Sequence, residues 1–317
     1  MDRRALIIGH TGQDGLILST ILAKKGFEIY GISRSKVSPN FATPKNGIKY
    51  SVCDFEDLKE AIKLSNPDHI YYLAAVHQSS SDVTLDESKL IKDSFEINVI
   101  GISNVLELCK IFSPRSKIFY AASSHIFGIP PIEPQNESVC RNPLGIYGIT
   151  KSAGLSICEY YREKYGLCAS VGILYNHESE FRQKNFVTSK IVHTAVDIKL
   201  GKANKLELGN LDSRIDWGMA SDYMEAAFMI NNAAKADTYV IGSGISYSIL
   251  DFVNTTFDYL GLNWTDFVDT NPNIVKKEIT FQLRADNSKL KNKLGWTPKY
   301  SFENMVHHLV DCQLKNS

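Results

Sequence analysis

A short apolar run, a cluster of glycines and an amphipathic segment follow one another near the start of the chain. The run RALII at residues 4–8 leads into GHTGQDG at residues 9–15. The next segment, LILSTILAKKG at residues 16–26, repeats apolar residues at helical spacing up to Gly26. A strand, a glycine-rich turn and a helix in this order begin a strand–helix unit of a parallel sheet. No other stretch constrains the fold as strongly.

The alternation of strand and helix continues through the first half of the chain. Further apolar runs predict strands, and segments of helical spacing predict helices; the strands are at 27–32, 48–54, 69–75, 117–122 and 168–175, the helices at 57–64, 86–112 and 146–166. The strands are continuously apolar, as expected where helices cover both faces of a sheet. We therefore predict an α/β fold, a doubly wound (Rossmann-type) parallel sheet.

The pattern loosens after residue 175, where polar loops separate short elements. This change predicts a dinucleotide-binding domain at 1–175. The remainder, 176–317, is predicted to be a smaller and mainly substrate-binding portion that is partly interleaved with the sheet.

The composition excludes several classes of protein. The 317 residues include 35 Lys and Arg and 35 Asp and Glu, so the net charge gives no reason to expect nucleic acid or an anionic membrane as a partner. The sequence shows no signal-peptide pattern and no apolar stretch long enough to span a bilayer, which predicts a cytoplasmic protein. The six cysteines have no ligand spacing, so we expect reduced thiols and no metal site.

The glycine-rich turn suits a pyrophosphate. Gly9 permits a tight turn, Gly12 lets the backbone approach the ligand, and Gly15 allows the helix to pack closely on the strand. The N-terminus of the following helix supplies N–H donors. We therefore assign the turn to a dinucleotide, with the intervening residues Thr11, Gln13 and Asp14 in the same site. A turn of this composition without a ligand is the alternative.

The end of the second strand indicates which dinucleotide is bound. An acidic residue there would bind the ribose of NAD, but the chain has Arg34 and hydroxyl neighbours, which favour the 2′-phosphate of NADP. NAD is the alternative cofactor, and a solvated basic loop is the alternative role for this segment. Asp54, with its neighbour Phe55, is predicted near the adenine, and Leu73, Ala74 and Ala75 provide a small surface for the cofactor.

Three further residues form a candidate catalytic set. Tyr147 and Lys151 lie one helical turn apart, and Ser123 ends the strand that precedes this helix. The charge of a lysine at this spacing is expected to lower the tyrosine's pKa, so that the phenolate works near neutral pH. A tyrosine and a lysine at this spacing on an ordinary helix surface are the alternative.

The serine, tyrosine and lysine together resemble the extended short-chain dehydrogenase/reductase family. The resemblance is most specific to the GDP-mannose 4,6-dehydratases, and it covers nearly the whole chain. It rests on TGQDG (11–15), ILYNHES (173–179), NFVTSKI (185–191), LGNLDSRIDWGMASDY (208–223) and ADNSKLKNKLGWTPKYSFE (285–303).

The resemblance implies roles for individual residues. Tyr147 would take the proton from O4 of a sugar while hydride leaves C4 for the cofactor. Lys151 would hold the ribose, and Ser123 would bind O4. His177 and Arg182 would contact the cofactor. The implied substrate contacts are Ser124, Asn176, Asn185, Phe186, Val187, Lys190 and Arg214.

The resemblance also implies partners. The substrate would be a nucleotide-sugar, with GDP as the nucleotide. The protein would form a homodimer or homotetramer through the helices near 86–112 and 146–165.

Three positions depart from the family pattern. His125 stands where the family has its catalytic glutamate. Ile215 replaces a basic residue, with Arg214 one place earlier, and Glu180-Phe181-Arg182-Gln183 follows NHES. Histidine can accept and return a proton, so dehydration to a 4-keto-6-deoxy sugar is one hypothesis. A C4 oxidoreductase or epimerase, in which His125 only hydrogen-bonds the sugar, is the second. A non-catalytic cofactor sensor is the third.

Overall fold

A parallel sheet of seven strands forms the centre of the molecule. The computed structural model describes residues 3–33, 46–48, 52–76, 86–271 and 283–317. The strand order is β10-β6-β5-β4-β1-β2-β3, and every neighbouring pair is parallel. The strands are β1 (Arg3–Ile8), β2 (Phe27–Ile32), β3 (Asn46–Ile48), β4 (His69–Tyr72), β5 (Lys117–Ser123), β6 (Ala169–Leu174) and β10 (Thr238–Ile241). The order reverses between β1 and β4, where ligands bind in open α/β sheets.

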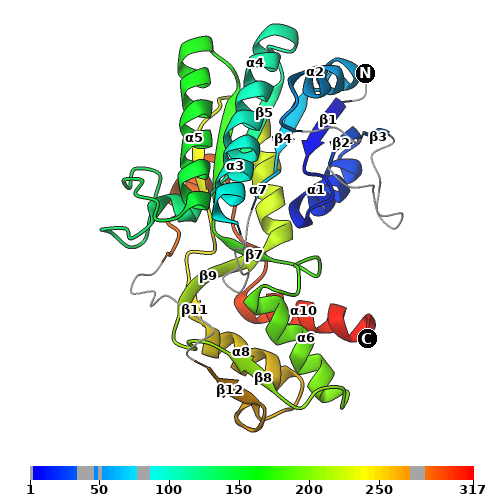
Figure 1. The fold of residues 1–317 in the computed structure, drawn as a ribbon, viewed down its shortest axis with the longest axis vertical. Helices are drawn as coiled ribbons and strands as arrows, with labels where there is room; N and C mark the ends of the chain where they lie inside the picture. Colours follow the sequence, from blue (N-terminus) through cyan, green and yellow to red (C-terminus); the bar gives the residue numbers. More distant parts are fainter. Residues whose placement is uncertain (1–2, 34–45, 49–51, 77–85, 272–282) are drawn as a thin grey trace.

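Helices cover both faces of this sheet. On one face α4 packs against both α2 and α5, and on the other α1 packs against α7 (Figure 1). Their bounds are α1 (Gln13–Lys24), α2 (Phe55–Ser65), α3 (Glu87–Phe95), α4 (Ile102–Phe112), α5 (Ile146–Tyr165) and α7 (Ala220–Asn232). The predicted doubly wound fold is confirmed.

Most predicted elements occur at their expected places, but the strand predicted at 69–75 ends at Tyr72, and two other elements also differ. The predicted helix at 86–112 is continuous, but Glu96–Gly101 between α3 and α4 is a π-helix. The strand predicted at 48–54 is wrong in its second half, because residues 52–54 lie outside any strand. The reason is local: Asp54 caps α2 by accepting hydrogen bonds from the backbone N–H groups of Glu56 and Asp57, so the chain turns into a helix there.

A second, smaller core lies beyond the carboxyl edge of the sheet, in the lower part of Figure 1. Its centre is aromatic: the ring centroids of Trp217 and Phe252 are 5.4 Å apart, and Phe302 stacks on Trp217. The elements are β7 (Asn176–Glu178), α6 (Val187–Lys199), β8 (Leu206–Leu208), β9 (Arg214–Met219), β11 (Ser246–Ser248), α8 (Ile249–Tyr259), β12 (Val268–Thr270) and α10 (Phe302–Lys315).

The second half of the chain also contributes to the main sheet. β10 pairs with β6 at its edge, α7 packs on β5 and β6, and α9 (Ser288–Leu294) packs on β10. The first core cluster accordingly includes Tyr223, Val240 and Trp296 beside residues of β1, β2, β4, β5 and β6. Among the described helices, none has the length and apolar composition that a membrane crossing requires.

Candidate active site

A cavity of about 670 Å³ lies at the carboxyl ends of the strands and gathers most of the predicted site residues. Its wall is formed by the turn after β1, the segment after β4, the end of β5, the start of α5, and β7 with the loop that follows. The predicted residues that line it are Gly9, Thr11, Gly12, Gln13, Asp14, Gly15, Leu73, Ala74, Ala75, Ser123, His125, Tyr147, Lys151, Asn176, His177, Arg182 and Phe186.

The glycine-rich turn has the geometry of a dinucleotide cradle. Gly9 has a φ of +93°, and a Cβ there would lie 2.7 Å from the backbone nitrogen of Ala74. A Cβ at Gly15 would lie 2.4 Å from the carbonyl oxygen of Gly9, so α1 packs directly on the turn. Gly12 is the N-cap residue of α1 and provides no side-chain cap, which leaves the helix N-terminus available to an anion at the cavity wall. These features fit the pyrophosphate of a dinucleotide.

Ser123, His125 and Tyr147 meet where β5 ends and α5 begins. The Oγ of Ser123 accepts a hydrogen bond from the backbone N–H of His125 at 3.3 Å. The rings of His125 and Tyr147 are 5.6 Å apart at 81°. Gly148 permits this approach, because a Cβ there would lie 2.5 Å from the carbonyl oxygen of His125. The structure therefore brings the predicted set together.

Lys151 is buried below the tyrosine. Its ammonium donates to the carbonyl oxygen of Ala121 at 2.8 Å and lies 5.8 Å from the centroid of the Tyr147 ring. Burial lowers the pKa of Lys151 to about 7.

The pKa of Tyr147 moves in the direction opposite to the sequence prediction. The pKa of Tyr147 is raised to about 12, chiefly by burial; a hydrogen bond with Ser123 and the charge of Arg182 lower it in part, and Asp14 contributes to the rise. Lys151 is not among the groups that shift this pKa, and burial is the largest cause of the shift.

His125 faces the cavity. Its side chain is exposed to the cavity, yet protein atoms surround the ring, and this burial lowers the pKa of His125 below 6.5. The imidazole is therefore neutral at neutral pH and able to accept a proton.

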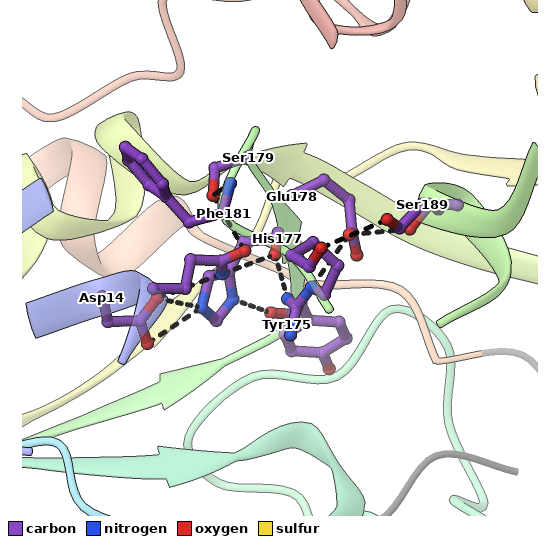
Figure 2. A network of polar contacts seen from close by, with 10 residues as sticks. Asp14, Tyr175, His177, Glu178, Ser179, Phe181 and Ser189 are labelled. Carbon is purple, nitrogen blue, oxygen red and sulfur yellow. Dashed lines mark hydrogen bonds and ion pairs between the residues drawn. The ribbon is translucent and has the colours of Figure 1, made fainter. Parts of the chain in front are cut away.

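A dense polar network joins the glycine-rich turn to β7 (Figure 2). The Nε2 of His177 lies 3.1 Å from each carboxylate oxygen of Asp14, and Nδ1 lies 2.7 Å from the carbonyl oxygen of Tyr175. Gln13 donates to the carbonyl oxygen of His177 and accepts from Ser179. The TGQDG and NHES motifs, distant in the sequence, thus contact each other directly.

The same network reaches the substrate portion through Glu178. This buried carboxylate accepts from Arg182 Nε at 3.0 Å and from Thr188 Oγ1 at 2.7 Å, and Thr188 belongs to the first turn of α6. Ser189, the next residue, donates to the carbonyl oxygen of Arg182 (Figure 2).

Several predicted residues lie outside the cavity wall. Asp54 caps α2 and Phe55 begins that helix, and neither lines the cavity; their place near the adenine stays a prediction. Lys190 donates to the carbonyl oxygen of Glu207, and Arg214 donates to that of Ser246. Ser124, Asn185 and Val187 are adjacent in sequence to lining residues but do not line the cavity themselves. The prediction for Arg34 concerns a residue outside the described ranges.

The cavity also has wall residues that the sequence did not single out. Asp93 and Ile97 lie one turn apart and reach the wall from α3 and the π-helical segment. Glu178 and Phe181 follow His177. Glu178 could have been found, because it belongs to the NHES motif, whereas Asp93 carries no local signal. Within the described ranges no group of three or more metal-binding side chains occurs.

Comparisons with known proteins agree with this geometry. The sequence profile of the family described as GDP-mannose 4,6 dehydratase matches residues 6–309. GDP-mannose 4,6 dehydratase 1 of Arabidopsis thaliana is 35% identical over 328 residues, which cover 98% of this chain and 90% of that protein. This chain belongs to the GDP-mannose 4,6-dehydratase family. The predicted family is confirmed.

Solved structures share the fold at lower identity. The structure of RMD from Pseudomonas aeruginosa complexed with NADPH has a TM-score of 0.84 at 19% identity and covers 100% of this chain and 99% of that chain. The dTDP-glucose 4,6-dehydratase from Bacillus anthracis, in complex with NAD, has a TM-score of 0.83 at 20% identity, covering 99% of this chain and 97% of that chain.

Proposed function

We propose that this protein is a nucleotide-sugar 4,6-dehydratase that acts on GDP-mannose or a close analogue, with His125 in place of the family's catalytic glutamate. One observation carries the proposal: the imidazole of His125 faces the same cavity as the Tyr147 phenol, and burial keeps it neutral. A neutral imidazole is the form that removes a proton.

The first part of the reaction oxidises C4 of the sugar. Ser123 hydrogen-bonds the O4 hydroxyl. Tyr147 takes the O4 proton in its phenolate form, so the phenol has to lose its own proton before the reaction begins. Lys151 contributes a positive charge beside the phenol. NADP, when bound, supplies the chemistry of accepting a hydride from C4 and returning it to C6. The residues fit this cofactor through the glycine-rich cradle.

The second part eliminates water across C5 and C6. The C4 ketone acidifies the C5 proton, and His125 removes it and becomes imidazolium. His125 then gives this proton to the departing 6-hydroxyl, which leaves as water. Tyr147 returns the O4 proton to C5 when C6 is reduced. The product has lost one water, and both side chains regain their starting protonation states.

Two observations concern the cofactor. The neighbouring structures named above hold NADPH in one case and NAD in the other, which agrees with the predicted nicotinamide dinucleotide. We propose NADP as the cofactor, with NAD as the alternative, because Arg34 follows β2. The ratio of NADP to NAD affinity should fall in Arg34→Ala; an unchanged ratio would contradict the assignment.

Product masses test the reaction. Incubation with GDP-mannose and NADP should give a product lighter by one water. His125→Ala should lower this yield by about a hundredfold, and His125→Glu, which restores the family's carboxylate, should retain more of it. Equal dehydration by His125→Ala and the wild type would eliminate the histidine's role.

A second candidate function follows from the same replacement. If His125 only hydrogen-bonds the sugar, the enzyme stops at C4 chemistry as an oxidoreductase or epimerase. Its product would lose two hydrogens, or keep its mass with C4 inverted. A third result, binding of NADP with an unchanged sugar, would indicate a sensor.

We propose that two copies associate through α3 to α5. Large apolar side chains are exposed on these helices, including Ile91, Phe95, Ile100, Ile149 and Tyr160. Light scattering at micromolar concentration should give the mass of a dimer or tetramer, and Phe95→Glu should weaken the association. A monomeric wild type would contradict this.

Two further proposals concern organisation and location. The second core supports a substrate-binding role for most of 176–317, since it lies beyond the sheet edge that carries the cavity. All six cysteines are free, which supports a reducing, cytoplasmic location.

A further inference from the structure

Both ring nitrogens of His177 face groups that only accept hydrogen bonds. Nδ1 lies 2.7 Å from the backbone carbonyl oxygen of Tyr175, and a carbonyl has no proton to give. Nε2 lies 3.1 Å from Oδ1 of Asp14 and 3.1 Å from Oδ2. A neutral imidazole has one N–H and could satisfy only one of these two contacts.

The alternative, in which Asp14 carries the proton and His177 is neutral, does not fit the geometry. A carboxylic acid would point one O–H at Nε2, whereas here the nitrogen is equally distant from both oxygens. Oδ1 also accepts a hydrogen bond from the side-chain amide of Gln13 at 3.2 Å. The contacts describe an ionised carboxylate against an imidazolium.

The surroundings agree with this charge state. Burial lowers the pKa of His177, but the Asp14 carboxylate outweighs burial and raises it above 6.5; Arg182 opposes this in part. Burial raises the pKa of Asp14, but His177 and Arg182 outweigh it and bring the value to about 2. Tyr223 of α7 stacks on the imidazole at 4.8 Å, and its pKa is raised well above 10, so it is neutral. Glu178 on the same strand is paired with Arg182.

We propose that His177 is an imidazolium at neutral pH and that it forms, with Asp14, a positioning pair that locks the cofactor turn to the substrate portion. This inference rests on the proposed function for its reaction, but its charge state does not depend on it. Asp14 lies in the first turn of α1, on the cradle itself, and His177 lies in the middle of β7.

The Asp14–His177 pair connects the cofactor site to the substrate portion. Asn176, predicted to face the sugar, precedes His177, and Glu178 follows it and holds the first turn of α6 through Thr188. The pair therefore fixes α6 and β7 relative to the cradle. A displacement of about 1 Å between reacting groups can lower a rate on the order of a hundredfold.

The charge state can be measured directly in the wild-type protein. Nitrogen-15 NMR of histidine-labelled enzyme at neutral pH, with assignment by loss of the signal in His177→Gln, should show both ring nitrogens of His177 at the shift of a protonated imidazole. An unprotonated nitrogen in the wild type would overturn the proposal, whether or not the enzyme turns over a sugar.

Two variants test the positioning role. Asp14→Asn keeps the shape and one acceptor but removes the charge, and His177→Gln removes the imidazolium. In each, kcat should fall by about ten- to a hundredfold while the Kd of NADP, measured by fluorescence without sugar, changes less than about threefold. Deuterium at C4 of GDP-mannose should slow these variants more than it slows the wild type, since hydride transfer becomes more rate-limiting. His308→Gln, which breaks the looser His308–Glu180 contact at 3.9 Å, is the matched control and should leave both values unchanged.

Two other results would contradict the positioning role of Asp14 and His177. An unchanged kcat in Asp14→Asn would show that the pair does not position anything. A rise in the Kd of NADP as large as the fall in kcat would make the pair a cofactor contact only.

Discussion

Two walls of the cavity differ in the charge states of their titratable groups. On the wall formed by β5 and α5, burial is the largest cause of the pKa shifts of His125, Tyr147 and Lys151, and each shift favours the uncharged form. On the wall formed by the turn and β7, ionised groups are paired, as in Asp14–His177 and Glu178–Arg182. The first wall holds groups that can gain or lose protons during a reaction, and the second holds groups whose charges are fixed.

The largest effect is expected from the first wall. Tyr147→Phe removes the proton acceptor but keeps the ring against His125, so kcat should fall by about a thousandfold or more. Cofactor affinity should stay within about twofold, since the cradle is untouched. Turnover can be followed by mass spectrometry and affinity by fluorescence titration. Substantial residual turnover would mean that another group accepts the O4 proton.

The pH dependence of kcat/KM tests the protonation states of His125 and Lys151 on the same wall. The expected change in activity is smaller than that of Tyr147→Phe. The pKa of His125 lies below 6.5, so activity should decline on the acid side as His125 becomes protonated. The pKa of Lys151 is about 7, so activity should decline as pH rises through that value and the ammonium loses its charge. On each limb of the profile, kcat/KM should change by about tenfold per pH unit.

Lys151→Arg sharpens this test, because arginine stays charged throughout. The alkaline limb should move to higher pH in that variant. A limb that stays in place would assign it to another group.

The smallest effect is expected for Asp54, a predicted site residue that lies outside both walls of the cavity. Asp54→Ala removes the cap of α2 and should lower the free energy of unfolding by about 1 kcal/mol, measured by urea denaturation. The Kd of NADP should not change. Weaker cofactor binding with unchanged stability would restore the role near adenine that the sequence suggested.

The sequence predicted the fold because its signals are local. Continuous apolar runs mark β1, β2, β5 and β6, and the glycines of the turn need no distant partner to be recognised. The end of the strand predicted at 48–54 was wrong because the capping role of Asp54 outweighed the apolar pattern before it.

The sequence predicted which residues form the site better than it predicted their pKa shifts and charged contacts. Ser123, His125, Tyr147 and Lys151 meet as expected, since parallel strands and the helices after them share one edge. The raised pKa of Tyr147 depends on burial, which spacing along a helix does not reveal. The contact between Asp14 and His177 joins residues 163 positions apart in the sequence, and no periodicity encodes it.

The position of β10 has a consequence for how the protein is made. This strand comes from residues 238–241 yet completes the sheet beside β6, and α7 from residues 220–232 covers β5 and β6. During synthesis, the first 175 residues leave the ribosome with an open sheet edge and an uncovered apolar face. The nascent six-stranded sheet therefore lacks its seventh strand until more than 60 further residues have been made, and its edge beside β6 stays unpaired during that interval.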